Sequence, residues 1–124
     1  PSFDRNVLIL SGGDPAGILW TAPETRGIRA ELVEKGYDLA ALRRFAQAID
    51  PVAFAHRADP RRILMINAAN DRTVLREKTV ALWKAFGKPK IEWYPAGHYS
   101  LALYIPGILP RALAFVSALP AKEK

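Results

Sequence analysis

The stretch from residue 61 to residue 100 constrains the fold more than any other part of the chain. An apolar run, Ile63–Ile66, is followed by a helical pattern over Val74–Phe86 and by a second short strand pattern over Lys90–Tyr94. Gly87 is expected to end the helix, as glycines commonly do. Two strands joined by a helix predict a βαβ unit, in which the strands are parallel and the loops after them open at the same edge of the sheet.

Each of these two loops carries a side chain suited to acid–base chemistry. Asp71 follows the first strand of the unit, and His98 follows the second strand, directly after Gly97. The predicted topology brings the two side chains together, and a carboxylate that orients an imidazole makes up two members of a nucleophilic triad. In the simpler alternatives, Asp71 only caps the following helix, a role that Thr73 could also fill, and His98 is a surface histidine in a turn.

The order of these elements resembles the C-terminal part of the α/β-hydrolase superfamily. The resemblance rests on the order of the elements. A strand is followed by the sequence Asn70–Val74 and a helix, and a second strand is followed by Gly97-His98 and another helix. It implies that Asp71 is the acid, that His98 is the general base and that the reaction is the hydrolysis of small carboxylic esters. Residues Val7–Asp14 resemble the strand that follows the nucleophile helix in that family, so the chain looks like the last three strands of a hydrolase.

The sequence has no obvious nucleophile for this pair. It contains no Gly-x-Ser-x-Gly motif, which forms the nucleophile elbow of such enzymes. Ser11 is the first candidate, because it ends an apolar strand at the predicted site edge. Its alternative is a serine in a tight Ser-Gly-Gly turn that bonds its own backbone. We expect Ser100 to cap a short helical turn, and we keep Asp14 as an alternative acid.

Three functions therefore remain open from the sequence. The first is a serine-hydrolase-like esterase that uses His98 and Asp71 with a non-standard nucleophile. The second is an inactive hydrolase remnant or binding module that has kept the fold and lost the chemistry. The third is one chain of a split hydrolase whose serine comes from a partner. The other histidine, His56, lies in a helical context and carries no motif.

The remaining patterns predict a single α/β domain over residues 1–124, with a short parallel sheet of about three strands and about five flanking helices. The first strand, Asn6–Leu10, is a continuous apolar run, which is typical of a strand covered on both faces. Helical patterns fill most of residues 23–59, where Thr21 and Glu24 fit a capping box. A last helix is predicted from about Pro106 to Leu119.

The amino-acid composition limits which metals, cofactors and macromolecules we expect this chain to bind. The chain has no cysteine and two histidines far apart in sequence, so we expect no metal and no cofactor, and we favour a reducing, cytoplasmic location. The net charge of +6 is scattered, which argues against nucleic-acid binding. No apolar run is expected to approach membrane-spanning length. Because Val7–Leu10 would be too apolar for a solvated sheet edge, we expect a homodimer that covers it.

Overall fold

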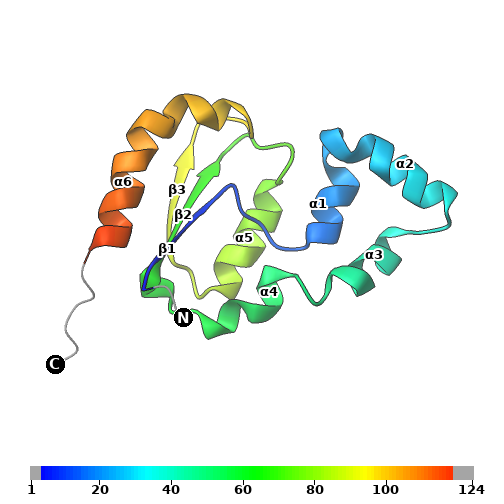
Figure 1. Cartoon of the computed structure of the whole chain (residues 1–124), viewed down its shortest axis with the longest axis horizontal. Helices are drawn as coiled ribbons and strands as arrows, with labels where there is room; N and C mark the ends of the chain where they lie inside the picture. Colours follow the sequence, from blue (N-terminus) through cyan, green and yellow to red (C-terminus); the bar gives the residue numbers. More distant parts are fainter. Residues whose placement is uncertain (1–3, 119–124) are drawn as a thin grey trace.

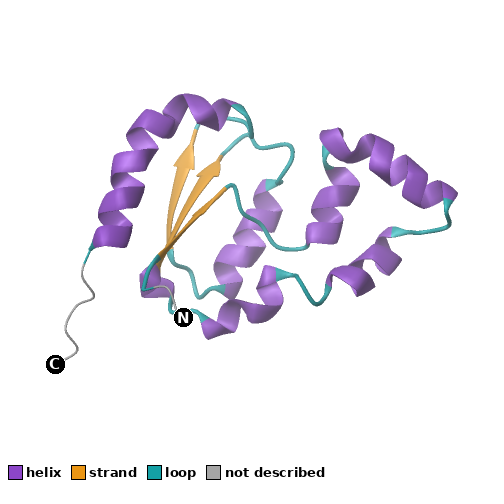
Figure 2. Cartoon of the chain, in the orientation of Figure 1, coloured by secondary structure: helices purple, strands orange, loops and turns teal. Residues whose placement is uncertain are grey.

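The computed structural model describes residues 4–118, and these form one parallel sheet flanked by helices (Figure 2). Within them the sheet has three strands in the order β1-β2-β3: β1 (Asn6–Ile9), β2 (Ile63–Ala68) and β3 (Lys90–Tyr94). Both strand pairs are parallel, with Leu8 opposite Met65 and Ile66 opposite Glu92. The predicted α/β class, the parallel βαβ unit and the three-stranded sheet are confirmed.

Strand β2 lies at the centre of the sheet, and all six of its residues are buried. Alternate residues of a strand point to opposite faces, so β2 contributes side chains to two apolar clusters, one on each face of the sheet. One face packs with α6 (Ile105–Ser117) through residues that include Ile66 and Ile108. The other face packs with α5 (Arg76–Ala85) through Met65 and Leu82. Figure 1 shows these two helices on opposite sides of the sheet.

Strand β1 is an edge strand, and its side chains contact the helix layers on both faces of the sheet as expected, although they are only partly buried. Within residues 4–118 it pairs with β2 only, and Ile9 is 42% exposed. The apolar run reflects a strand that contacts both helix layers, through Val7 and Leu10 on one side and Leu8 on the other. Its outer edge and part of its surface remain open, because no further described strand lies beside it.

The final helical stretch is longer and more apolar than expected. The 3-10 helix η4 (Ser100–Tyr104) leads directly into α6. By length and composition alone, the 18 residues Ser100–Ser117 are sufficient to cross a membrane, which corrects the expectation that no run approaches this length. Buried Leu101 and Ile108 attach the stretch to the sheet, whereas Leu109 and Leu113 are exposed. The predicted end at Leu119 lies outside the described residues.

A helical segment connects β1 to β2 and projects away from the sheet (Figure 1). It is more finely divided than expected, so that residues 4–118 hold six α-helices rather than about five. Gly36, with φ +83°, follows α2, and Asp38 caps α3 by accepting from Ala41 N–H. The elements of the segment are α1 (Pro15–Thr21), η1 (Pro23–Thr25), α2 (Arg26–Glu34), α3 (Leu39–Ala46), α4 (Pro51–Phe54), η2 (Ala55–Arg57) and η3 (Pro60–Arg62).

The predicted capping box at Thr21 and Glu24 is wrong. Helix α1 already begins at Pro15, where Asp14 Oδ1 accepts from Gly17 N–H. Thr21 is the last residue of this helix, and its hydroxyl donates back to the Gly17 carbonyl at 2.9 Å. The Glu24 side chain bonds elsewhere, so the local Thr-x-x-Glu spacing is overridden by a contact from a distant part of the chain.

Asp14 links the helical segment to the rest of the molecule. Its Oδ2 lies 2.7 Å from Arg43 Nη2 on α3 and 2.7 Å from Lys78 Nζ on α5. Hydrogen bonds from Arg43 and from Lys78 lower the pKa of the Asp14 carboxyl far below its ordinary value. Asp14 is therefore a structural anchor in this structure, with its carboxylate held by two cations.

Candidate active site

Asp71 uses its two carboxylate oxygens for different partners. Oδ1 accepts the backbone N–H groups of Thr73 and Val74, at 2.8 and 2.9 Å. Oδ2 lies 2.9 Å from His98 Nδ1. The side chain of Asp71 is 3% exposed. The expectation that Thr73 would cap this turn in place of Asp71 is wrong, because Asp71 closes the turn and contacts His98 at the same time.

The loop that carries His98 is fixed against the loop that carries Asp71. Asn70 N–H donates to the Ala96 carbonyl at 2.9 Å, which joins the two loops backbone to backbone. Gly97 N–H donates to Ser100 Oγ at 2.8 Å, so Ser100 closes the turn around His98. The expectation that Ser100 caps this helical turn is wrong, because Ser100 is the first residue of η4 and its hydroxyl accepts from Gly97, which lies before the helix. These bonds explain why two short loops after parallel strands place Asp71 and His98 in contact.

The contact with Asp71 determines which imidazole nitrogen is available for chemistry. An ionised carboxylate can only accept hydrogen bonds, so in a neutral His98 the proton sits on Nδ1 and points at Asp71. This leaves Nε2 with its lone pair as the proton acceptor. His98 is 26% exposed at its side chain, so solvent and small molecules can reach the ring.

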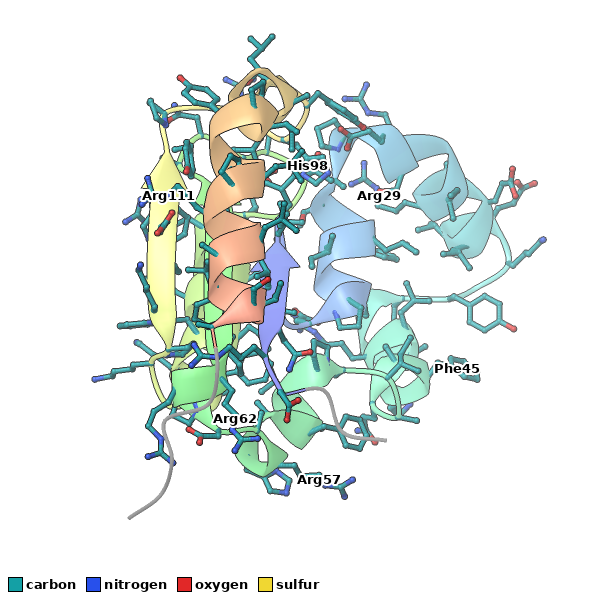
Figure 3. The ribbon with its side chains drawn as sticks, turned by 60° about the vertical axis from the view of Figure 1, so that its left-hand side comes forward. Arg29, Phe45, Arg57, Arg62, His98 and Arg111 are labelled. Atoms are coloured by element: carbon teal, nitrogen blue, oxygen red, sulfur yellow. The ribbon has the colours of Figure 1, made fainter. Side chains whose placement is uncertain are left out.

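Two hollows meet at His98. A polar hollow of about 400 Å³ is lined by residues that include Glu24, Arg72, Thr73 and His98. An apolar hollow of about 320 Å³ lies between the end of β1 and η4, and its lining includes Ile9, Leu10, His98 and Ile105. Figure 3 shows His98 at the end of the molecule where α6 begins, on the side of the helical segment. His98 therefore borders both hollows, one of which has several polar lining residues.

Ser11 is not hydrogen-bonded to His98 in this structure. Its Oγ is buried and has no hydrogen-bond partner among residues 4–118. The alternative in which the Ser11 hydroxyl bonds its own turn is therefore wrong. The backbone carbonyl of Ser11 accepts from Thr79 Oγ1 on α5 at 3.0 Å, which ties this loop to the helix. Leu10, just before it, has φ +52°, a left-handed conformation that costs energy for a residue with a branched side chain.

The other residues considered from sequence lie away from the His–Asp pair or have other partners. Asp14 is held by Arg43 and Lys78, so it does not serve as the partner of His98. His56 is exposed in η2. Among the described residues there is no cluster of metal-ligating side chains.

Glu24 is the residue at this site that sequence reasoning missed. It lies in η1, yet its Oε1 accepts the Thr73 hydroxyl at 2.8 Å, 49 positions along the chain. A hydrogen bond from its own backbone N–H, followed by that from Thr73, lowers the pKa of Glu24. No local sequence pattern indicates such a contact, since it depends on where η1 lies relative to the loop after β2.

No protein-family model matches this chain, and no curated protein shows significant similarity to it. Its function is therefore inferred from the geometry of the His–Asp pair and its surroundings.

Proposed function

We propose that this chain is a serine-hydrolase-like protein that cleaves small carboxylic esters, with His98 as the general base and Asp71 as its orienting acid. The observation that carries the proposal is the 2.9 Å contact between His98 Nδ1 and Asp71 Oδ2. It is supported by the two backbone bonds that hold Asp71 Oδ1 and by the exposure of His98. Together they give an imidazole of fixed orientation with one nitrogen directed away from its carboxylate.

In the proposed reaction, His98 Nε2 takes the proton of a hydroxyl as its oxygen attacks the ester carbonyl carbon. Asp71 stabilises the imidazolium that forms, without itself taking the proton. The tetrahedral intermediate then collapses, the bond to the alcohol oxygen breaks and Nε2 returns the proton to that oxygen. When the attacking hydroxyl belongs to a serine, the acyl group is left on that serine; Nε2 then takes a proton from water, which attacks the acyl carbon, and the bond to the serine oxygen breaks as that oxygen takes the proton back, releasing the carboxylic acid. The polar hollow, about 400 Å³ in volume, offers space for a small ester beside the ring.

Ser11 is our candidate for the attacking hydroxyl within this chain. Its Oγ is committed to no other partner among the described residues, and it follows the strand adjacent to β2. Attack by Ser11 requires its loop to turn toward His98, because the two side chains are not bonded in this structure. We therefore expect slow turnover. The absence of a nucleophile elbow adds to this, because removal of one oxyanion donor alone costs about a hundredfold or more in rate.

A second candidate function is suggested by the open edge of β1. The apolar hollow of about 320 Å³ extends from Ile9 and Leu10 at this edge to His98. A serine on a partner polypeptide that covers the edge would enter the site from this side, and the chain would then supply the acid–base half of a split hydrolase. We further propose that a second copy of this chain covers Val7–Leu10 in a homodimer, and that the protein is cytoplasmic.

Hydrolysis of p-nitrophenyl acetate by the pure chain tests the first function. We expect slow catalytic release of p-nitrophenol that His98→Ala abolishes. His56→Ala is the matched control, because it removes the other, exposed histidine and should leave the rate unchanged. Equal rates in wild type and His98→Ala would contradict the esterase proposal and favour an inactive remnant or binding module.

A further inference from the structure

Two hydrogen bonds link the Glu24 side chain to the Asp71 side chain, and both are made by Thr73. The Glu24 carboxylate accepts the hydroxyl of Thr73 at 2.8 Å, and the backbone N–H of Thr73 donates to Asp71 Oδ1 at 2.8 Å. The first bond holds the side chain of Thr73, and the second uses its backbone. Displacement of Thr73 would thus disturb the turn that sets the direction of the Asp71 carboxylate.

Glu24 is also connected to His98, through Tyr99. The Tyr99 ring packs edge-on against the His98 ring, with centroids 5.3 Å apart and an interplanar angle of 76°. Tyr99 is 69% exposed, so burial does not hold it in this position. Its hydroxyl instead lies in the field of the Glu24 carboxylate, which raises the pKa of Tyr99. The Glu24 carboxylate therefore bonds the turn closed by Asp71 and acts electrostatically on the residue after His98.

We propose that Glu24 is a positioning residue that ties both loops of the His–Asp pair to the helical segment, holding Asp71 through Thr73 and His98 through Tyr99. An effect of Glu24 on catalytic rate rests on the proposed ester-cleaving function. Its effect on the orientation of the His98 imidazole is independent of that function. The other charged residue that lines the polar hollow, Arg72, stands on the loop after β2. Glu24 differs because it comes from η1, outside the βαβ unit.

Because Glu24 belongs to the helical segment, the orientation of the His98 and Asp71 side chains depends on the position of that segment. When η1 lies against the loops, Thr73 and Tyr99 are both held. When it moves away, both lose their interaction with Glu24 in the same motion. The carboxylate is exposed, so each interaction alone is weak in water. Their combined effect is on orientation, and a small misplacement of a base has a large effect on rate.

Nitrogen-15 NMR of the imidazole rings tests the proposal without requiring activity. The chain has two histidines, so exposed His56 serves as an internal reference. We expect wild-type His98 to show one dominant tautomer protonated at Nδ1, with a slowly exchanging Nδ1–H. Glu24→Ala and Thr73→Val should give a mixture of tautomers and faster exchange at His98, with the His56 signals unchanged. Thr73→Val keeps the backbone N–H and removes only the hydroxyl.

Conservative and control variants separate positioning from general destabilisation. Glu24→Gln keeps an oxygen that accepts hydrogen bonds and should retain the wild-type His98 spectrum. Glu31→Ala removes an exposed glutamate from neighbouring α2 and should change nothing. If ester cleavage is present, Glu24→Ala should lower kcat about tenfold with KM little changed, and Glu24→Gln should restore most of it.

The outcomes also distinguish this proposal from the proposed function. An unchanged His98 spectrum in both Glu24→Ala and Thr73→Val would overturn the positioning role, whatever the activity. A changed spectrum in variants of a chain that cleaves no ester would support the positioning role and reject the esterase. If Glu24→Ala does not fold, Thr73→Val and Tyr99→Phe decide the question, because each removes one hydroxyl from the surface of the site.

Discussion

Asp14 and Lys78 lie 64 positions apart in the sequence and are joined by a 2.7 Å hydrogen-bonded ion pair. The Lys78 side chain is 16% exposed and Asp14 is 25% exposed, so the pair is largely shielded from solvent. This ion pair connects Asp14, which immediately precedes α1, to Lys78 on α5. The position of the helical segment relative to the sheet depends in part on this bond.

We predict that Asp14→Asn lowers the free energy of unfolding by about 1–2 kcal/mol near neutral pH, through loss of the charge-assisted bonds to Arg43 and Lys78. Asparagine still caps α1, so helix content should be retained. Because the folded state lowers the pKa of Asp14, its stabilisation is present above the unfolded value of about 3.9 and is lost as the pH falls through the folded value. Urea unfolding between pH 2 and pH 7 should show wild type and variant converging at acid pH. A constant difference over this range would contradict the assignment.

We predict that Asp71→Asn preserves the fold and removes most of any activity. The side-chain oxygen of the introduced asparagine can still accept from Thr73 and Val74 N–H, while its amide N–H₂ faces His98 Nδ1. The imidazole then carries its proton on Nε2 and cannot act as a base there. The equivalent change of tautomer in a serine protease lowers kcat about 10⁴-fold. Ester hydrolysis and thermal unfolding measure the two effects. Loss of stability comparable to Asp71→Ala would show that the carboxylate is needed for folding.

We predict opposite effects from two serine variants. Ser11→Ala removes a buried hydroxyl without a partner among the described residues and should leave stability unchanged or raise it, by up to about 1–3 kcal/mol. It should abolish activity if Ser11 is the nucleophile. Ser100→Ala removes the acceptor of Gly97 N–H and should cost about 0.5–1.5 kcal/mol while leaving some activity. Activity in Ser11→Ala at the full wild-type rate would assign the attacking oxygen to water or to another chain.

We predict that Ile9→Lys converts the proposed homodimer to a monomer. Ile9 lies on edge strand β1 and is 42% exposed, and a lysine on an edge strand disfavours pairing with another strand. Ile28→Lys is the control, because Ile28 lies on α2 and is 52% exposed. Sedimentation velocity at micromolar concentration should show a dimer for wild type and Ile28→Lys and a monomer for Ile9→Lys. A wild-type monomer would refute the dimer.

The sequence predicted the part of the site that depends on local topology. A buried strand, a helix ended by Gly87 and a second strand are enough to place Asp71 and His98 at one sheet edge, and the two residues are in contact. Patterns of glycine, proline and apolar residues act within a few positions, so they predict such units well.

The sequence did not predict what depends on contacts between distant segments. Glu24 fits a capping box locally, yet it bonds Thr73 because the helical segment folds over the loops. Ser11 does follow the predicted strand, but the chain takes a left-handed turn at Leu10 and the Ser11 carbonyl bonds to α5. The apolar run of β1 predicted contacts on both faces of the sheet, which are present, but it does not show how much of the strand stays exposed at the open edge.

The helical segment over residues 15–62 enters and leaves the sheet between neighbouring strands, β1 and β2, and its α1, α2 and α3 contact chiefly one another. Phe45 on α3 points outward from it (Figure 3). The segment is an insertion between two paired strands, so the register of β1 against β2 does not depend on its length. Its contacts through Asp14 and Glu24 nevertheless make its position matter to the loops that carry the His–Asp pair.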